Sequence, residues 1–423
     1  MFFAMLYDKM TAEMIRKFSV NRKRRRETMK TAIINAAVIR GNEILPDHGV
    51  LIKDGKIEKV CPMKQIDTTG YDQLIDAKGA YASAGWIELH THGIGGYDFM
   101  DAESDKIAGA LQAYAEHGVT GVFPTTMSAP FAEVRKSLDS FAAADLENAG
   151  GAKFLGIHLE GPYFNPAQAG AQPPDKLAKP CDREYEKLVE EYPFIARIDA
   201  APELPGGLDM PGFLKPRGIV AGMAHTDASA AEVKAAAEAG YTIATHLYSG
   251  MSVVHRINGY RHAGTVEGCF LQDDVYTEAI CDSIHLPAEL LQLIYKVKGP
   301  DRMILVSDSM RGAGLPEGTE CMLGAKDTGT LVVVEKGVAW MPDRQAFAGS
   351  VATYDRLIRT AVNYAGLPLT DVIKMATKTP AAVMKLQDKG ELKPGFDADV
   401  TLFNGDVQVQ LTMVEGKVVY QRD

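Results

Sequence analysis

The chain has 423 residues, 46% hydrophobic and 24% charged, which is the composition of a globular protein with room for a large core and an accessory domain. Its net charge of −10 argues against nucleic acid or an anionic membrane surface as a partner, although a few local cations could still hold a phosphorylated substrate. No uninterrupted apolar stretch reaches the roughly 18 residues that span a bilayer.

The first 28 residues differ from the rest of the chain in their pattern of apolar and charged residues. Met1–Val20 has a weak helical pattern and the basic run Arg22–Arg26 follows it, whereas a signal peptide carries its charges before the apolar stretch. We therefore expect residues 1–28 to be a peripheral extension. The five cysteines are scattered and form no C-x-x-C pair, which favours reduced thiols in the cytoplasm.

Both ends of the remaining chain have strand-like patterns. TAIINAAVI, GVLIKDGKIEKV and QLIDAKGAYASAG follow Met29, with Asp54-Gly55 as a hairpin turn. ADVTLFN and QVQLTMVEGKVVYQR close the chain, with a second turn at Glu415-Gly416. Because each segment is short, we expect residues 29–84 and 392–423 to combine into one small β-sandwich domain.

Residues 85–391 alternate between strands and helices. Repeated βα units imply a parallel sheet, and this many units in one domain favour a (β/α)8 TIM-like barrel. A doubly wound sheet is the rival fold, but no glycine-rich dinucleotide fingerprint follows any expected strand. The expected helices are Ser104–His117, Phe131–Ala149, Ala228–Ala239, Pro287–Lys296, Thr353–Ala365 and Asp371–Thr377.

Several expected strands end in a residue that can bind a metal. GWIELHTHG ends in His90 and His92, and alternate side chains of a strand share one face, so both imidazoles can face one ion. Any one such residue is more often structural, but a series at the ends of barrel strands predicts a Zn²⁺ or Fe²⁺ site. The others are Glu160 in FLGIHLEGP, His225 in IVAGMAHTD, His246 in YTIATH and Asp308 in RMILVSD.

These segments also carry a family resemblance. The chain from residue 29 to 423 resembles the N-acetylglucosamine-6-phosphate deacetylases of the amidohydrolase superfamily. The resemblance implies a metal-bearing (β/α)8 barrel with a small β-sandwich from both termini. The motifs that carry it are HLEGPYFNPAQAGAQ, AAPE, HTDA, THLYSGM, VSD, AGS, MATKTPAAV and GELKPGFDADVTLF.

The resemblance also implies roles for individual residues. Glu160, His225 and His246 would hold the main divalent metal, His90 and His92 would serve a second site, and Asp308 would be the catalytic acid and base. Arg261 would reach the neighbouring subunit's pocket in a homodimer. The implied substrate-binding residues are Ala171, Gln172, Ser249, Gly250, Arg261 and His285.

The implied reaction is hydrolysis of the acetamide of N-acetylglucosamine 6-phosphate. Ser249-Gly250 stands where much of the family has Asn-Ala, and Arg261–Gly264 departs from Arg-Glu-Pro-Gly, so two elements that lie near the sugar phosphate in the family differ here. The alternatives are the galactosamine epimer, another amidohydrolase such as a dihydroorotase-like or deaminase-like enzyme, and a non-catalytic scaffold. We expect His158 to point to the opposite side of its strand from Glu160 and to be structural.

Overall fold

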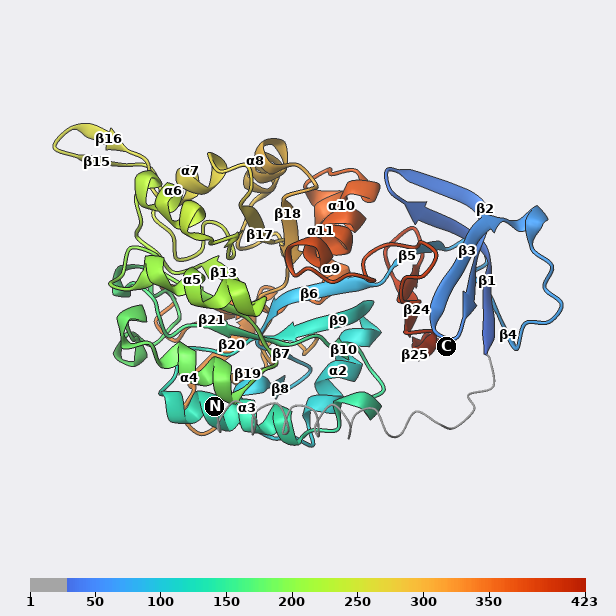
Figure 1. Cartoon of the computed structure of the whole chain (residues 1–423), viewed down its shortest axis with the longest axis horizontal. Coiled ribbons are helices and arrows are strands. Elements are labelled where there is room, and N and C mark those ends of the chain that lie inside the picture. Colours follow the sequence, from blue (N-terminus) through green and yellow to red (C-terminus); the bar gives the residue numbers. More distant parts are fainter. Residues whose placement is uncertain (1–28) are drawn as a thin grey trace, which may run out of the picture.

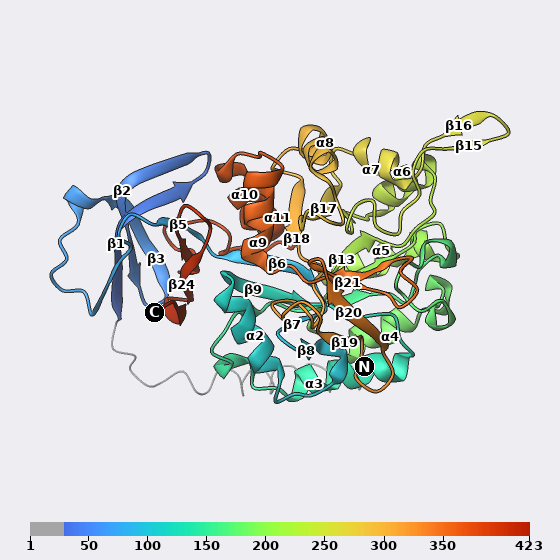
Figure 2. The same ribbon diagram turned by 180° about the vertical axis from the view of Figure 1, so that it is seen from behind.

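The structure is a computed structural model that describes residues 29–423 (Figure 1). A small sheet-rich part lies beside a larger part in which helices surround parallel strands, and Figure 2 shows the same division from behind. The prediction for residues 1–28 lies outside the described residues. None of the described helices is long and apolar enough to cross a membrane.

The smaller part is a sheet built from both ends of the chain, in the order β25-β24-β23-β5-β1-β2-β3, with β4 paired to β1. The strands of the predicted sandwich are joined in one continuous sheet. The long strand β1 joins its parts: its first half pairs with β4, its second half pairs with β5, and bulges interrupt its pairing with β2 between the two halves. Its strands are β1 (Lys30–Arg40), β2 (Glu43–Lys53), β3 (Lys56–Pro62), β4 (Gln73–Asp76), β5 (Tyr81–Ala84), β23 (Val400–Phe403), β24 (Val409–Val414) and β25 (Lys417–Gln421).

Both predicted hairpin turns of this sheet are confirmed. Asp54-Gly55 joins β2 to β3 with φ of 51° and 78°, and Glu415-Gly416 joins β24 to β25 with φ of 47° and 78°. Two consecutive left-handed residues are the signature of the type I′ turn, whose twist matches that of the paired strands.

The larger part contains a ring of parallel strands. Within residues 29–423, hydrogen-bonded ladders join β10, β9 and β6 in one sheet and β11, β12, β13, β14, β17 and β18 in another. Parallel bridges from Thr125 to His158 and from Thr91 to Ser309 connect the two sheets at both edges. The ring strands are β6 (Trp86–Thr91), β9 (Val119–Pro124), β11 (Ile157–Glu160), β12 (Ile195–Ala200), β13 (Val220–Met223), β14 (Ile243–Ala244), β17 (Tyr276–Ile280) and β18 (Met303–Val306), with β10 (Lys153–Phe154) beside β9.

Helices pack against the outside of the ring and bury the main hydrophobic core. The predicted helices are present with shifted ends: α3 stops at Ala143, six residues early, and α10 starts at Leu369. Short helices α4, α5, α7 and α11 were not predicted. The helices are α2 (Ile107–Glu116), α3 (Phe131–Ala143), α4 (Glu184–Glu191), α5 (Met210–Leu214), α6 (Ala230–Ala239), α7 (Thr265–Phe270), α8 (Ala288–Lys298), α9 (Tyr354–Arg359) with a π turn (Thr360–Tyr364), α10 (Leu369–Ala376) and α11 (Lys378–Val383).

Three insertions at the ends of ring strands were also not predicted. The largest is an antiparallel four-stranded sheet between β18 and α9, and its last strand is bridged to the ring by Ser309 and Ser350. A hairpin between β14 and α7 projects from the molecule (Figure 1). The strands are β7 (Gly93–Ile94) with β8 (Tyr97–Asp98), β15 (His255–Ile257) with β16 (Tyr260–His262), and β19 (Glu320–Leu323), β20 (Thr330–Glu335), β21 (Val338–Trp340) with β22 (Phe347–Ser350).

Candidate metal and active site

The six predicted metal-site and catalytic residues converge at one end of the ring. His90 lies on β6 with His92 just beyond it, and Glu160 is the last residue of β11. The other three follow their strands by two residues: His225 after β13, His246 after β14 and Asp308 after β18. Because parallel strands in a ring end together, residues distant in sequence meet there.

Three of these residues have left-handed backbone. The φ angles are 44° at His225, 31° at His246 and 47° at Asp308, a conformation that costs a non-glycine residue about 1–3 kcal/mol. Hydrogen bonds to the surrounding backbone hold each one: the His225 carbonyl accepts from Asn165, the His246 carbonyl from Ser249, and the Asp308 amide donates to His90. The chain thus turns sharply after each strand, with the side chains gathered over the ring.

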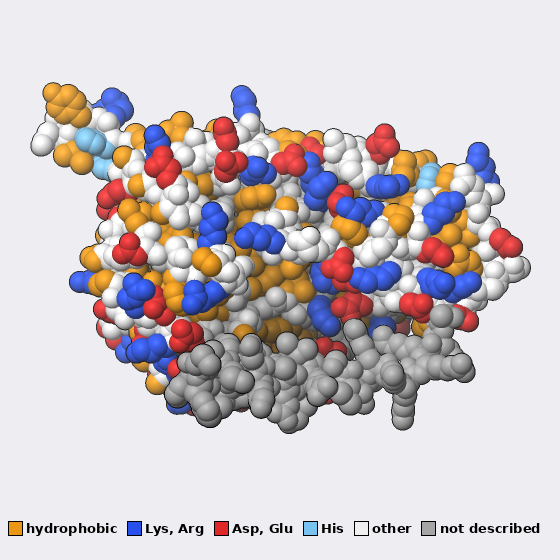
Figure 3. All heavy atoms as spheres, viewed as in Figure 1, with side chains coloured by type: hydrophobic (Ala, Val, Ile, Leu, Met, Phe, Trp, Pro, Cys, Tyr) orange, Lys and Arg blue, Asp and Glu red, His pale blue; other side chains and the backbone are white. Residues whose placement is uncertain are grey.

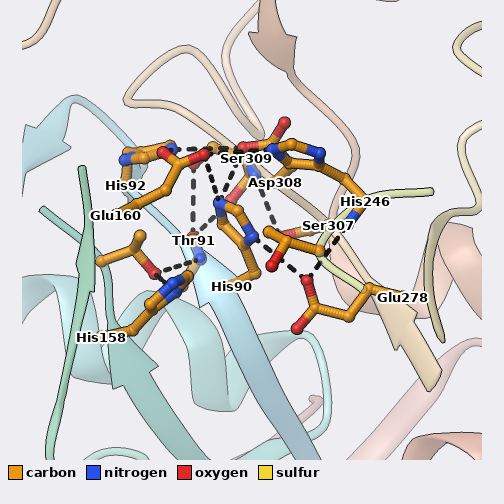
Figure 4. Close-up of polar contacts among 12 residues, drawn as sticks. His90, Thr91, His92, His158, Glu160, His246, Glu278, Ser307, Asp308 and Ser309 are labelled. Carbon is orange, nitrogen blue, oxygen red and sulfur yellow. Dashed lines mark hydrogen bonds and ion pairs between the residues drawn. The ribbon is translucent and has the colours of Figure 1, made fainter. Parts of the chain in front are cut away.

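The buried carboxylate of Glu160 is the centre of the cluster (Figure 4). Its Oε1 lies 3.0 Å from His246 Nε2 and 3.2 Å from His225 Nε2, and its Oε2 lies 3.3 Å from His92 Nε2. Asp308 Oδ1 lies 3.2 Å from His92 Nε2 and 3.4 Å from His90 Nε2. Two groups, His90–Glu160–His246 and His90–His92–Asp308, each bring three ligand atoms within 4.8 Å of one another.

Hydrogen bonds to the outer ring nitrogens test whether this cluster fits a metal. His225 Nδ1 lies 2.8 Å from the carbonyl oxygen of Gln168, which can only accept, so this nitrogen carries a hydrogen. In the neutral ring Nε2 then turns a lone pair toward Glu160. His90 Nδ1 likewise faces the Glu278 carboxylate at 3.3 Å, and its buried Nε2 has no hydrogen-bond partner in the described part of the chain. Lone pairs and carboxylate oxygens that converge in this way fit a divalent cation.

The charges of the site perturb one another strongly. Burial opposes ionisation of Glu160, yet His90 and the other rings hold its pKa well below the ordinary 4.5. Burial also opposes ionisation of Asp308, but His90 and His92 lower its pKa to about 2. Burial lowers the pKa of His92, and contacts with Asp308 and Glu160 outweigh this and raise it to about 9. In the absence of a metal, protons on the histidines supply the positive charge that the carboxylates require.

A cavity of about 190 Å³ opens above the cluster. The predicted substrate-binding residues Ala171, Gln172, Ser249, Gly250 and His285 all line it. Met127 and Leu323 add apolar walls, as do Ala346, Phe347 and Ala348 from β22 and the loop before it. The unpredicted sheet β19–β22 therefore closes one side of the cavity.

Arg261 is the exception among the predicted substrate-binding residues. It lies on β16 of the projecting hairpin, paired with Arg256 of β15, and it is exposed. Arg261 is not among the described residues that line the cavity of its own chain. This position is compatible with the prediction that it serves a neighbouring subunit, which stays a prediction.

Two of the cavity residues are tied to the metal cluster. Gln172 donates from Nε2 to Glu160 Oε2 at 2.9 Å, and its Oε1 accepts from the Ser128 amide, which anchors the side chain that holds Glu160. At Gly250 a Cβ would lie 2.6 Å from His225 Nδ1, in the middle of the hydrogen bond from that ring to Gln168. With φ of 57°, this position requires glycine for both space and conformation.

His285 is held by a buried carboxylate. Its Nδ1 lies 2.7 Å from Asp282 Oδ2, and the other oxygen of Asp282 accepts from the amides of Ile284 and His285. The ring also packs edge-on against Phe347, with centroids 5.0 Å apart. With Nδ1 bound to Asp282, His285 keeps Nε2 free for a group in the cavity.

The prediction that His158 points away from Glu160 is wrong. Residues two apart on a strand share a face, and the ring of His158 lies edge-on against His90 with centroids 4.8 Å apart. His158 Nε2 lies 2.8 Å from Asp199 Oδ2, and Thr125 Oγ1 contacts its Nδ1. Burial and Arg197 lower the pKa of His158 to about 4, so it is a neutral packing residue.

A buried ionic network beneath the cluster was not predicted. Arg197 binds both oxygens of Asp199 at 2.8 and 2.9 Å, donates to Thr245, and makes a short contact with Glu278. Arg197, Asp199 and Glu278 have no exposed surface. The available signal was the charges within the apolar strands IARIDA and YTEAI, since a buried charge requires a partner.

Comparison with known proteins gives consistent results. A model of the amidohydrolase family matches residues 81–419, and a model of the NagA composite domain matches residues 31–79. The chain is 31% identical to N-acetylglucosamine-6-phosphate deacetylase of Lysinibacillus sphaericus, over 92% of this chain and 97% of that protein. It is 29% identical to N-acetylgalactosamine-6-phosphate deacetylase of Escherichia coli O157:H7, over 88% and 95% respectively.

Solved structures resemble the whole described chain. The crystal structure of N-acetylglucosamine-6-phosphate deacetylase from Pasteurella multocida has a TM-score of 0.84 at 25% identity, and the match covers 93% of this chain and 100% of that one. A mutant of the Mycobacterium smegmatis enzyme in complex with N-acetyl-D-glucosamine-6-phosphate has a TM-score of 0.83 at 26% identity, with the same coverage.

The first prediction concerns Glu160→Gln. The amide keeps the shape of the side chain but removes the negative charge that faces the histidines, so the purified variant should contain much less divalent metal than the wild type. Elemental analysis measures this directly. The same substitution at exposed Glu147 is the control and should leave the metal content unchanged. Full metal content in Glu160→Gln would contradict the assignment.

The second prediction concerns pH. The pKa of His92 rises from the ordinary 6.5 to about 9 in the metal-free fold, so its proton contributes stability that is present below pH 6.5 and is lost as pH rises through 9. Ligand histidines are unprotonated when a metal is bound. The Tm of chelator-treated protein should therefore fall between these two pH values, and that of metal-loaded protein should fall less. Parallel curves would count against the prediction.

Proposed function

Since the chain belongs to the amidohydrolase family and, within it, to the N-acetylglucosamine-6-phosphate deacetylases, we propose that it hydrolyses the acetamide of N-acetylglucosamine 6-phosphate. The products are glucosamine 6-phosphate and acetate. The observation that carries this proposal is the cavity in which Asp308 and a histidine-surrounded carboxylate, Glu160, face the same space. A chain that kept only the fold as a scaffold would not need this set of ligands.

The proposed metal is Zn²⁺ or Fe²⁺, with one or two ions per subunit. Glu160, His225 and His246 would hold the main ion, and His90 and His92 would serve a second one. The contacts of Glu160 with His225 and His246 at 3.2 and 3.0 Å support the first group. When bound, a divalent ion supplies Lewis acidity, which polarises the acetyl carbonyl and lowers the pKa of water to roughly 7.

Asp308 is the proposed general base and acid. As a carboxylate that faces the cavity, it can take a proton from the attacking water. The same proton then passes to the departing nitrogen of the sugar, which would leave poorly as an anion. The left-handed backbone at Asp308 and its contacts with His90 and His92 hold the carboxylate toward the cavity.

The remaining cavity residues are proposed to bind the sugar phosphate. Ser249 and Gly250 can offer backbone amides to an anionic group, and this does not depend on their side chains. His285 can donate from Nε2 to a sugar or phosphate oxygen because Asp282 fixes its orientation. Ala171 and Gln172 form the adjacent wall.

We propose that the enzyme is a homodimer in which Arg261 completes the partner's phosphate site. Figure 3 shows the hairpin that carries Arg261 projecting beyond the body of the molecule with hydrophobic side chains at its end. Tyr260 is 77% exposed and Val254 and Ile257 about half exposed in the single chain. A partner subunit that covered them would remove apolar surface from water.

The finer architecture and location are also proposals. The ring of parallel strands corresponds to a (β/α)8 barrel of residues 85–391, and residues 29–84 and 392–423 form the small β domain. The order of parallel pairings and the presence of β23–β25 beside β5 support this division. The free cysteines favour a cytoplasmic location.

A substrate panel tests the proposed function. Acetate release should be fastest with N-acetylglucosamine 6-phosphate, slower with its galactosamine epimer, and slowest with both sugars lacking the phosphate. The galactosamine phosphate is the second candidate because two of the similar proteins are named N-acetylgalactosamine-6-phosphate deacetylases. No acetate from any member of the panel would refute the proposal.

The third prediction concerns Asp308→Asn. The amide cannot accept a proton from water, so kcat should fall by about 10²–10⁴ while the main metal ion stays bound. Steady-state kinetics and elemental analysis on the same preparation measure the two effects. A variant that turns over at nearly the wild-type rate would place the general base elsewhere.

The fourth prediction concerns Arg261→Ala. Loss of a guanidinium that binds phosphate should raise KM for N-acetylglucosamine 6-phosphate at least tenfold, or roughly 1.4 kcal/mol, and leave the unphosphorylated sugar unaffected. Arg256→Ala on the paired strand is the matched control and should have little effect. Equal changes for both substrates would show that Arg261 does not bind the phosphate.

A further inference from the structure

The Glu278 side chain contacts two residues of the metal cluster from below (Figure 4). Its Oε2 lies 3.3 Å from His90 Nδ1 and accepts from the backbone amide of His246 at 3.3 Å. Glu278 is on β17 and is completely buried. A single carboxylate oxygen thus connects the β6 and β14 ligands of the site.

The other oxygen of Glu278 also has a partner. Its Oε1 makes a short contact with Nη1 of Arg197, whose remaining donors bind Asp199 and Thr245. An arginine held by three acceptors cannot move without leaving buried charges unpaired. Glu278 is therefore fixed in position, and each of its oxygens faces a donor.

This arrangement determines which nitrogen of His90 carries a hydrogen. Because a carboxylate only accepts, Nδ1 must donate to it, and the neutral ring then has its lone pair on Nε2. Nε2 is the atom that lies 3.4 Å from Asp308 and 3.7 Å from Glu160, and it has no hydrogen-bond partner among residues 29–423. The lone pair thus points to the centre of the proposed metal cluster.

We propose that Glu278, braced by Arg197, is a positioning residue that holds His90 as an Nε2 ligand for the divalent metal. The inference rests on the proposed metal site and adds to it a residue outside the ligand set. Carboxylate partners of this kind fix the orientation of a ligand imidazole, and their loss weakens metal binding by about 10–100-fold.

Glu278→Gln is the informative change because an amide cannot accept at both ends. If its carbonyl oxygen faces Arg197, its NH₂ group faces His90 and favours the hydrogen on Nε2, where a metal must bind. If the carbonyl faces His90, two donors meet at Arg197. Two donors that face each other at a buried guanidinium are the costlier arrangement, so the first orientation is favoured and His90 is disturbed without a change in side-chain size.

The experiment measures Zn²⁺ affinity by chelator competition in the full-length protein, for the wild type, Glu278→Gln, His90→Asn and the double variant. Glu278→Gln should weaken the affinity about 10–100-fold, and the same change should have little further effect in the His90→Asn background. Asp199→Asn is the matched control: it disturbs the same arginine but contacts His158 instead of a ligand, so the affinity should change by less than about threefold.

Each other outcome is decisive. Equal weakening in both backgrounds, or an Asp199→Asn effect as large as that of Glu278→Gln, would reduce Glu278 to a structural residue and overturn the proposal. If His90→Asn weakens Zn²⁺ and Glu278→Gln does not, the proposal fails while the metal site stands. If His90→Asn itself has no effect, the assignment of His90 to the metal fails.

A second measurement needs no Glu278 variant and covers the case in which that variant does not fold. In ¹¹³Cd-loaded protein with ¹⁵N-labelled histidine, His90 should show cadmium coupling at Nε2 and a bound hydrogen at Nδ1. His90→Asn identifies the signal. Coupling at Nδ1 would contradict the proposed orientation.

Discussion

The structure depends on a buried carboxylate, Glu160, that faces the nitrogens of several histidines. Buried carboxylates and imidazole lone pairs are stable together only if positive charge lies between them, either as protons or as a metal ion. The strand ends and the left-handed backbone at His225, His246 and Asp308 bring these side chains close to one another. The fold itself thus assembles the ligands of the proposed site.

Directly below this site the ring contains a polar network, whereas bulky aliphatic side chains usually fill such an interior. Arg197, Asp199 and Glu278 bury one positive and two negative charges. The Nδ1 hydrogen of His90 and the backbone amide of His246 face Glu278. Such a network costs desolvation energy, which its hydrogen bonds offset only while every member is paired. It therefore links the rigidity of the ring interior to the orientation of the ligands above it.

The sequence predicted the parts of the site that follow from local pattern. Apolar runs that end in His, Glu or Asp correctly located the strand-end cluster, because parallel strands end at one face. It did not predict Glu278 or Arg197, whose importance comes from contacts between strands far apart in the sequence. The prediction for His158 was wrong because residues two apart on a strand share a face, so His158 lies on the same side of β11 as Glu160. The sheet β19–β22 was not predicted, because its strands are short and no helix with a recognisable apolar spacing separates them. The proposed role of Arg261 involves a second subunit, so a single chain cannot test it.

The most direct test of this account is a metal titration of chelator-treated enzyme with acetate release from N-acetylglucosamine 6-phosphate as the readout. The account predicts that metal-free protein is folded but inactive and that activity returns in proportion to Zn²⁺ or Fe²⁺ bound, reaching a plateau at one or two ions per chain. Full acetate release from protein that elemental analysis shows to be free of metal would contradict it.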